Sequence, residues 1–234
     1  RRRRSTRLFE AGKKIPVEHV RACLELASLA PNSSNMQLWE FYHVCDQGRL
    51  RELVAACLGQ SSVETADQVV VFVTRQDLYR RRSKDLLRME LEDIERFTPE
   101  NRKESRIKNR KNYYGFLMPF IYAKFFGLLG GFRKALAWSI GVFKPITREV
   151  SEGDMHAVVH KTCALAAQTF MLAMAGKGYD TCPLEGIDTA RVKKILGLPR
   201  GAKINMVIPC GVRAVDGVRH SQLRVPFDEI YHRL

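Results

Sequence analysis

Four arginines and a serine could together bind an oxyanion. Arg3, Arg4, Ser5 and Arg7 lie close together at the start of the chain, and Arg224 lies in a polar segment near its end. Arginine offers planar, forked donors and serine a short directional donor, and this combination binds phosphate. The same residues also describe a basic arm that lies in solvent, and Arg224 alone could be a surface charge. The residues by themselves favour neither interpretation.

Two polar loops could approach a flat heteroaromatic ligand. Residues 31–39 read Pro-Asn-Ser-Ser-Asn-Met-Gln-Leu-Trp, and their amides and hydroxyls could hydrogen-bond a ring edge. Residues 182–188 read Cys-Pro-Leu-Glu-Gly-Ile-Asp, where a proline and a glycine bracket a carboxylate and backbone amides that a ligand could approach closely. An ordinary connecting loop explains either segment as well.

The sequence lacks the residue groups that indicate a metal site or a protein nucleophile. Its six cysteines form no Cys-x-x-Cys pair and have no histidine at zinc-finger spacing, and its six histidines share no spacing. We therefore predict no metal, no catalytic side chain, and histidines that are exposed or hydrogen-bonded. Cysteine usage and the absence of an apolar signal segment after Arg1 predict a cytoplasmic protein, whether or not the native chain begins before Arg1.

The candidate residues lie between elements typical of a mixed helix and strand protein. Apolar spacing predicts helices over 17–30, 50–58, 158–175 and 188–196, with Asp154 and Asp188 as helix caps. Runs of β-branched and aromatic residues predict strands over 39–44, 69–74 and 204–212. The tail after Gly217 is polar, and we expect it to be extended, without a core of its own.

Residues 75–153 form an atypical basic and apolar insertion between these two blocks. Residues 76–111 hold 12 Lys or Arg and 8 Asp or Glu, which is typical of a solvated helical face. Residues 113–143 are aromatic and apolar, but Pro119 and internal glycines argue against one continuous membrane-spanning helix. Two hypotheses stay open for 113–143: a lid or dimer arm that forms an apolar acceptor pocket, or a peripheral membrane contact flanked by basic residues.

The formal net charge of +14 predicts an anionic cofactor, partner or surface. We do not expect nucleic acid to be that partner. No RNA-binding aromatic motif, helix-turn-helix pattern or zinc signature accompanies the basic residues. The charge therefore points to a small anionic ligand, to an anionic membrane surface, or to both.

Four motifs, in order, resemble the nitroreductase family of FMN-dependent oxidoreductases. The motifs are Arg3-Arg4-Ser5-Thr6-Arg7-Leu8-Phe9, Pro31 to Trp39, Pro183 to Asp188, and Leu196 to Pro199. The resemblance implies a single domain over 1–234 with an α+β fold, a three-layer α/β/α sandwich in which helices flank a central mixed sheet. It also implies a homodimer with flavin sites at the subunit interface and a tail that wraps around the partner.

The resemblance gives each candidate residue a role at FMN. Arg3, Ser5 and Arg224 would hold the phosphate, and Arg4 would flank it. Arg7 would face the pyrimidine edge of the flavin, and Gln60 would hydrogen-bond the same side. The ribityl chain and ring edge would be lined by Pro31, Asn32, Ser33 and Asn35, and one flavin face would be covered by Pro183, Leu184, Glu185 and Gly186.

The implied reaction is hydride transfer from NAD(P)H to FMN and then to an electron-poor acceptor, such as a nitroaromatic or a quinone, in ping-pong order. Alternatives are reductive dehalogenation or other flavin chemistry on the same fold, and a non-catalytic flavin-binding or membrane-surface protein. The chain departs from the family pattern at Asn32, Leu38 and Gln222, and the last removes a lysine that some members have near the phosphate. The insertion is the largest departure, so the acceptor is the least determined part of the reaction.

Overall fold

The computed structural model describes residues 3–234, and Arg1 and Arg2 lie outside the described residues. Its centre is a four-stranded sheet in the order β1-β2-β4-β3. The strands are β1 (Trp39–Val44), β2 (Gln68–Thr74), β3 (Asp180–Thr181) and β4 (Lys203–Gly211). The three predicted strands are confirmed to within one residue at each end, and the short β3 was not predicted.

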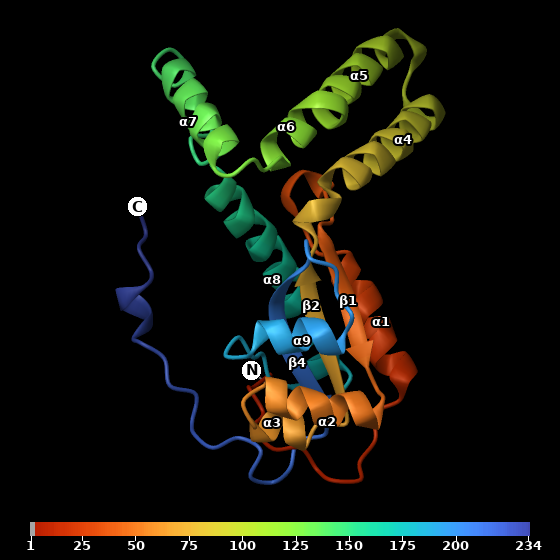
Figure 1. Cartoon of the computed structure of the whole chain (residues 1–234), viewed down its shortest axis with the longest axis vertical. Coiled ribbons are helices and arrows are strands. Elements are labelled where there is room, and N and C mark those ends of the chain that lie inside the picture. The colour runs from red at the N-terminus through yellow and green to blue at the C-terminus, as the bar shows by residue number, and fades with distance from the viewer. Residues whose placement is uncertain (1–2) are drawn as a thin grey trace.

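Helices cover both faces of this sheet, which confirms the three-layer α/β/α arrangement (Figure 1). One face carries α1 (Val17–Ser28) and α8 (Glu152–Gly176). The other face carries α2 (Gln47–Ala56), α3 (Ser61–Glu64) and α9 (Thr189–Ile195). Every residue of β2 is buried, because its continuous apolar run supplies side chains alternately to the two layers.

The sheet is less mixed than the resemblance implies. All three strand ladders are antiparallel, with Trp39 opposite Thr74 and Thr74 opposite Lys203. The connection from β1 through α2 and α3 returns to the same end of the sheet, so β2 runs opposite to β1. Within residues 3–234, the parallel pairing is an isolated bridge between Ser5 and Thr181, which attaches the N-terminal segment beside β3.

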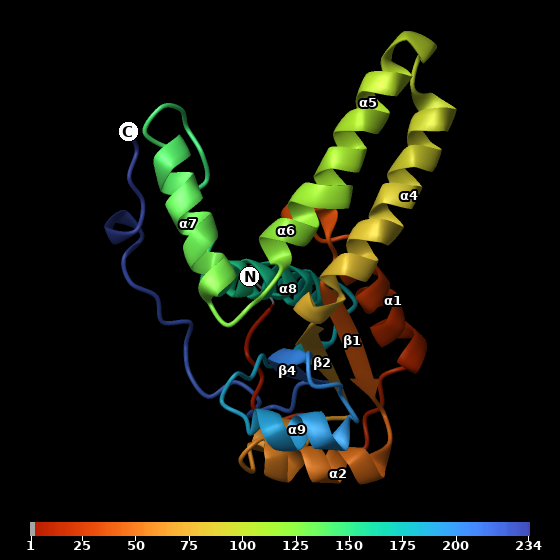
Figure 2. The same cartoon turned by 45° about the horizontal axis from the view of Figure 1, so that its top comes forward.

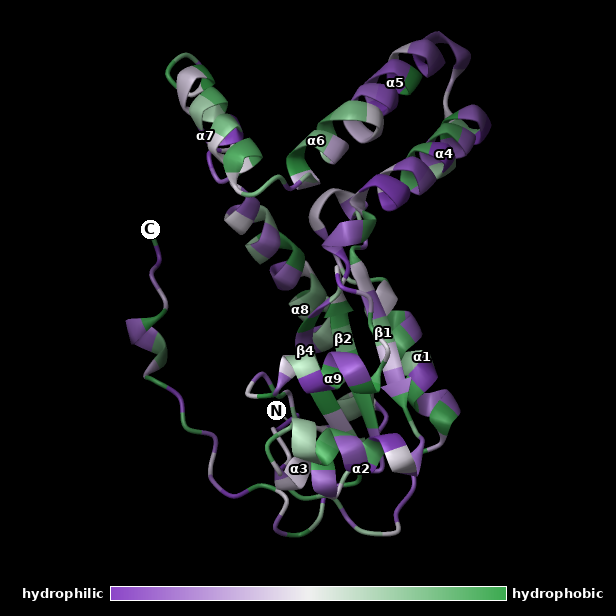
Figure 3. Ribbon diagram, in the orientation of Figure 1, coloured by the Kyte–Doolittle hydropathy of each residue, from purple (hydrophilic) through white to green (hydrophobic). Residues whose placement is uncertain are grey.

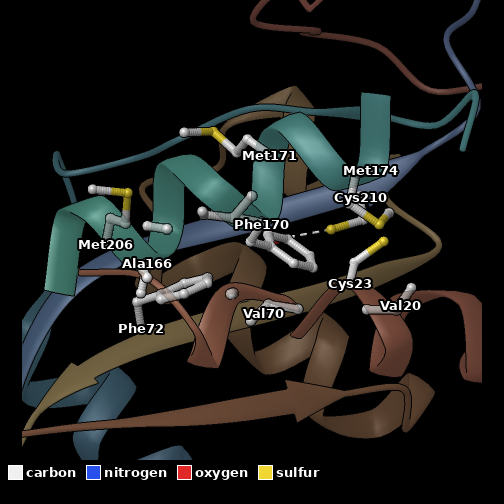
Figure 4. Close-up of a cluster of buried hydrophobic side chains, with 14 of the residues drawn as sticks. Val20, Cys23, Val70, Phe72, Ala166, Phe170, Met171, Met174, Met206 and Cys210 are labelled. Atoms are coloured by element: carbon white, nitrogen blue, oxygen red, sulfur yellow. Dashed lines mark hydrogen bonds between the residues drawn. The ribbon is translucent and has the colours of Figure 1, made fainter. Parts of the chain in front are cut away.

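An aromatic pair joins α8 to the sheet. Phe170 on α8 and Phe72 on β2 are fully buried, and their ring centroids lie 5.6 Å apart. This separation lies within the range at which aromatic pairs add to the stabilisation from burial alone. Figure 4 shows both rings between the helix and the sheet, with Cys23 of α1 completing the same cluster. The core of this half of the molecule therefore centres on α8.

The start of α8 corrects the predicted cap. The N-cap is Ser151, and Asp154 is the third residue of the helix rather than its cap. The Ser151 hydroxyl accepts the Asp154 backbone N–H at 3.0 Å, and the Asp154 carboxylate accepts the Ser151 backbone N–H at 2.9 Å. This reciprocal capping box lets the helix begin earlier than the apolar periodicity indicates.

The insertion consists of two helical arms that project from the sandwich (Figures 1 and 2). The first arm pairs α4 (Tyr79–Phe97) with α5 (Glu100–Asn112), and Arg110 contacts Glu90 across them at 3.2 Å. No residue of α5 is buried, so the predicted solvated face is confirmed. The hydropathy colouring of Figure 3 shows this arm as largely hydrophilic.

The apolar half of the insertion is broken, as the sequence predicts. The π-helical turn (Tyr113–Leu117) and α6 (Met118–Tyr122) continue α5 in the first arm, and α7 (Leu128–Ile140) forms the second arm (Figures 1 and 2). The described residues also contain short 3₁₀ turns at Ser33–Asn35, Gln76–Leu78 and Phe227–Glu229. Among the described helices, only α8 is long and apolar enough to cross a membrane, and its place in the core explains that composition.

Replacing Phe170 by alanine tests the role of the aromatic pair. Phe170→Ala leaves a cavity between α8 and β2, and we expect it to lower the free energy of unfolding by about 3–5 kcal/mol. Urea unfolding followed by circular dichroism measures this loss. The matched control is Gln168→Ala, an exposed position on the same helix. Equal losses in the two variants would contradict a core centred on this pair.

Candidate functional site

A basic pocket of about 370 Å³ lies between the N-terminal segment and the tail. It brings together the four residues that were expected to lie at a phosphate, Arg3, Arg4, Ser5 and Arg224, together with Arg7. The tail adds residues that the sequence did not single out, and these are Val218, Arg219, His220 and Ser221. Gln222 also lines the pocket.

Backbone contacts hold the N-terminal segment in place beside the sheet. The Thr6 N–H donates to the Thr181 carbonyl at 3.1 Å, and the Arg7 N–H donates to the Gly217 carbonyl at 2.6 Å. A side chain at Gly217 could not be accommodated, because its Cβ would lie 2.6 Å from the Leu8 carbonyl oxygen. The arginines therefore lie on a fixed segment of the fold rather than on a free basic arm.

The pocket is positively charged and has no internal counterion. No aspartate or glutamate lines it, and within residues 3–234 none of its five arginines pairs with a carboxylate. Arg4 instead donates to the His220 carbonyl at 2.5 Å, which ties the tail to the N-terminal segment. Forked donors without carboxylate partners are suited to a phosphate group.

A second group of predicted residues continues from this pocket along the same edge of the sheet. The Ser61 hydroxyl donates to the Arg7 carbonyl at 3.1 Å, and the neighbouring Gln60 side-chain amide donates to the Gly186 carbonyl at 3.0 Å. Leu184 and Val207 exchange backbone hydrogen bonds of 2.8 and 3.0 Å, which fix the loop from Pro183 to Gly186 beside β4. These contacts form one continuous surface from the basic pocket to this loop.

The third predicted group lies elsewhere. The loop from Pro31 to Asn35 leads into β1, at the opposite edge of the sheet from β3. Three strand spacings separate these two edges, which amounts to roughly 14 Å. One copy of the chain therefore does not bring Asn32, Ser33 and Asn35 to the basic pocket.

This loop is built tightly against the insertion. Ser34 and Asn35 have positive φ angles of 55° and 52°, and the Asn32 carboxamide oxygen accepts the Gln37 N–H at 2.9 Å. The Tyr113 hydroxyl donates to the Ser34 hydroxyl at 2.8 Å, and the Tyr114 hydroxyl donates to the Ser34 carbonyl at 3.1 Å. No local pattern in the sequence signals these contacts, which span about eighty residues of chain.

The histidines lie outside this surface, apart from His220, and most have partners. His160 on α8 contacts Thr74 at 3.4 Å and Asn205 at 3.2 Å, and thereby joins the helix to β2 and β4. Burial lowers the pKa of His160 to about 4, with further lowering by His156, Lys124 and Lys203. A neutral ring fits the contact in which the Asn205 amide donates to the His160 Nδ1. These features describe a structural histidine.

Comparison with known proteins identifies the family. The model of the nitroreductase family matches residues 1–212. The chain belongs to the nitroreductase family. It is similar over 227 residues, at 26% identity, to a candidate NAD(P)H nitroreductase of Bacillus subtilis named MhqN, covering 97% of this chain and 93% of that one. It is 24% identical over 234 residues to the protein DrgA of Synechocystis, covering 97% of this chain and 90% of the relative.

Solved structures of this family share the fold. A nitroreductase-like protein of Bacillus subtilis superposes with a TM-score of 0.73 at 22% identity, covering 99% of this chain and 95% of that chain. A family structure from Exiguobacterium sibiricum, solved in complex with FMN, superposes with a TM-score of 0.68 at 20% identity, covering 100% of this chain and 94% of that chain. The nitroreductase fold that the motifs predicted is thereby confirmed.

The low pKa of His160 predicts acid sensitivity. The unfolded chain binds a proton at the ordinary histidine pKa of about 6.5, whereas the folded protein binds it only near pH 4. His160 therefore stabilises the fold above pH 6.5, and this contribution is lost as the pH falls toward 4. We expect the loss of stability between pH 7 and pH 5 in urea unfolding to be smaller for His160→Gln than for wild type. His232→Gln, in the exposed tail, is the control, and identical pH profiles for all three proteins would refute this role.

Proposed function

We propose that this nitroreductase-family protein binds FMN and transfers hydride from NAD(P)H to an electron-poor small molecule, such as a nitroaromatic or a quinone. The observation that carries the proposal is the pocket of arginines without counterions, joined through Arg7, Ser61 and Gln60 to the loop from Pro183 to Gly186. The names of the relatives and the FMN complex of a structural neighbour agree with it.

The chemistry of the donors fits FMN. A phosphate needs several strong donors and no competing carboxylate, which is the composition of the pocket lining. Arg3, Ser5 and Arg224 would hold the phosphate, and Arg4 would flank it while it anchors the tail at His220. Six cysteines without disulfides among the described residues agree with a reducing, cytoplasmic setting for this reaction.

FMN supplies the hydride-accepting chemistry when bound, so the protein acts by binding, orientation and electrostatics. Arg7 would place a positive charge at the pyrimidine edge of bound FMN, where negative charge develops on reduction. The Gln60 side-chain amide donates to the Gly186 carbonyl, and this side chain would hydrogen-bond the same edge of the flavin. The loop from Pro183 to Gly186 contributes main-chain groups to one face, and we infer that donor and acceptor use the open face in turn, in ping-pong order.

We propose further that the site is completed in a homodimer. The loop that carries Asn32, Ser33 and Asn35 lies at the opposite edge of the sheet in one copy, so a second copy would have to supply it. Leu26 on α1 and Leu165 and Leu172 on α8 are exposed by 50, 46 and 54%, which provides an apolar surface for such a contact. The exposed tail, which leaves the sandwich in Figure 1, would wrap around the second copy.

Arg224 tests the phosphate assignment. Losing a hydrogen bond to a charged group costs about 1.5–3 kcal/mol, so we expect Arg224→Gln to weaken FMN binding by about tenfold or more. Quenching of flavin fluorescence on titration with protein measures the dissociation constant. Arg51→Gln, an exposed arginine on α2, should leave it unchanged. Equal dissociation constants for Arg224→Gln and wild type would remove Arg224 from the site.

Rapid mixing tests the reaction itself. NADPH and NADH are mixed separately with the FMN-loaded protein under anaerobic conditions, and the flavin absorbance is recorded. We expect at least one donor to bleach the flavin, and a nitroaromatic or a quinone added afterwards to restore the absorbance. A bound flavin that neither donor reduces would contradict the proposed function while leaving FMN binding intact.

A further inference from the structure

The second arm of the insertion and the neighbouring segment that leads into α6 expose large apolar side chains that the sandwich does not cover. We define the α6–α7 surface by its exposed members, which are Phe116, Phe125, Phe126, Leu128, Phe132, Trp138, Val142 and Phe143. Phe126 is 93% exposed and Phe143 is 89% exposed. Figures 1 and 3 show α7 projecting away from the sheet, with more hydrophobic colour than α4 and α5. Contiguous apolar surface of this kind marks a contact site for a partner or a membrane.

The charge around this surface is mainly positive, although Glu152 binds the Phe125 N–H and Asp154 lies 3.9 Å from Lys134. Residues 105–148 contain nine Lys or Arg and no Asp or Glu. Lys124, Lys134 and Lys144 are exposed within the aromatic stretch itself. Exposed aromatic side chains among an excess of cations match an anionic lipid surface, because the rings suit the headgroup region and the cations attract the lipid phosphates.

A buried arginine, Arg133, holds α7 in place relative to α6 and α8. Arg133 on α7 is 3% exposed, and its guanidinium donates to the carbonyls of Val150, Phe120 and Ala123 at 2.8, 2.7 and 3.0 Å. These bonds join α7 to the end of α6 and to the segment before α8. The α6–α7 surface is therefore displayed by a fixed scaffold and does not fold back onto the sandwich.

The start of α7 is fixed to α8 as well. The Glu152 carboxylate accepts the Phe125 N–H at 2.9 Å. Gly130 packs so closely here that a Cβ would lie 2.6 Å from the Glu152 backbone nitrogen. The exposed rings of Phe125 and Phe126 thus lie on a turn whose backbone is anchored on both sides.

The length of α7 favours contact with a membrane surface over a helix that spans the bilayer. The 13 residues of α7 make a helix of about 20 Å, which is shorter than the roughly 30 Å of a bilayer core. An apolar groove of about 370 Å³ between α6, α7 and residues 146–150 adds further apolar area beside the surface. A second copy of the chain has another apolar face available on α1 and α8. The excess of positive charge over residues 105–148 distinguishes the α6–α7 surface from the face on α1 and α8.

We propose that the α6–α7 surface docks the protein onto anionic membranes as a peripheral, interfacial element. Phe125, Phe126, Trp138 and Phe143 enter the headgroup region, while Lys134 and Lys144 contact the lipid headgroups. The sandwich stays in water, attached through Arg133 and Glu152. The proposal does not depend on FMN binding or on the reaction.

Flotation with vesicles tests the proposal on the full chain. We expect the protein to float with vesicles that contain phosphatidylglycerol, several-fold more than with pure phosphatidylcholine vesicles, and to be released by high salt. Phe126→Asn combined with Phe143→Ser should reduce the floated fraction at least tenfold, and Lys134→Gln combined with Lys144→Gln should reduce it with anionic vesicles only. Circular dichroism confirms that each variant is folded.

Phe97→Ser is the matched control, because Phe97 is 76% exposed at the end of α4, outside the α6–α7 surface, and its loss should leave flotation unchanged. Wild-type protein that stays in solution with both kinds of vesicle would overturn the proposal. Flotation that Phe126→Asn with Phe143→Ser leaves unchanged would overturn it too. If these substitutions instead dissociate a dimer and vesicles bind nothing, the surface contacts a second copy and the membrane proposal is wrong.

Discussion

The antiparallel pairing of β2 with β1 and β4 is the constraint on which the rest of this structure depends. Because β2 is buried on both faces, it fixes the register of its neighbours and the place of every loop that leaves the sheet. The basic pocket and the loop from Pro183 to Gly186 lie at the β3 edge, and the loop from Pro31 to Asn35 lies at the β1 edge. In the proposed function, these two groups of residues would meet only if a second copy supplied one of them.

The N-terminal end of α8 connects the sandwich to the insertion. Ser151 and Asp154 cap the helix, Glu152 holds the start of α7, and His160, about two turns after Glu152, bonds to β2 and β4. The same helix carries Phe170 into the core. The second arm is thus attached to a helix that carries eight buried residues, which explains how an exposed apolar surface keeps a defined position.

Local sequence patterns predicted the three long strands and the main helices of the sandwich, and the four motifs predicted the fold. The strand Trp39–Val44 is bounded as the sequence indicates, and Asp188 caps α9 by accepting the N–H groups of Ala190 and Arg191. The cap of α8 was assigned to the wrong residue because Ser151 and Asp154 are both capping residues, and only their reciprocal bonds show which one precedes the helix. The contact of Gln60 with Gly186 spans 126 residues, and no local pattern reveals such a pairing. Arg219 and His220 were not predicted either, because they line the pocket only as a result of the path that the tail takes through the fold.

The proposed site, assembled from two copies, has a direct consequence in solution. Sedimentation velocity over a dilution series of the FMN-loaded protein, recorded at the protein band and at the flavin band, measures which species carries the cofactor. Our structure predicts that bound flavin sediments only with a dimer of 26.8 kDa chains, and that dissociation on dilution releases it. Flavin that stays bound to a 26.8 kDa monomer would contradict the two-copy site.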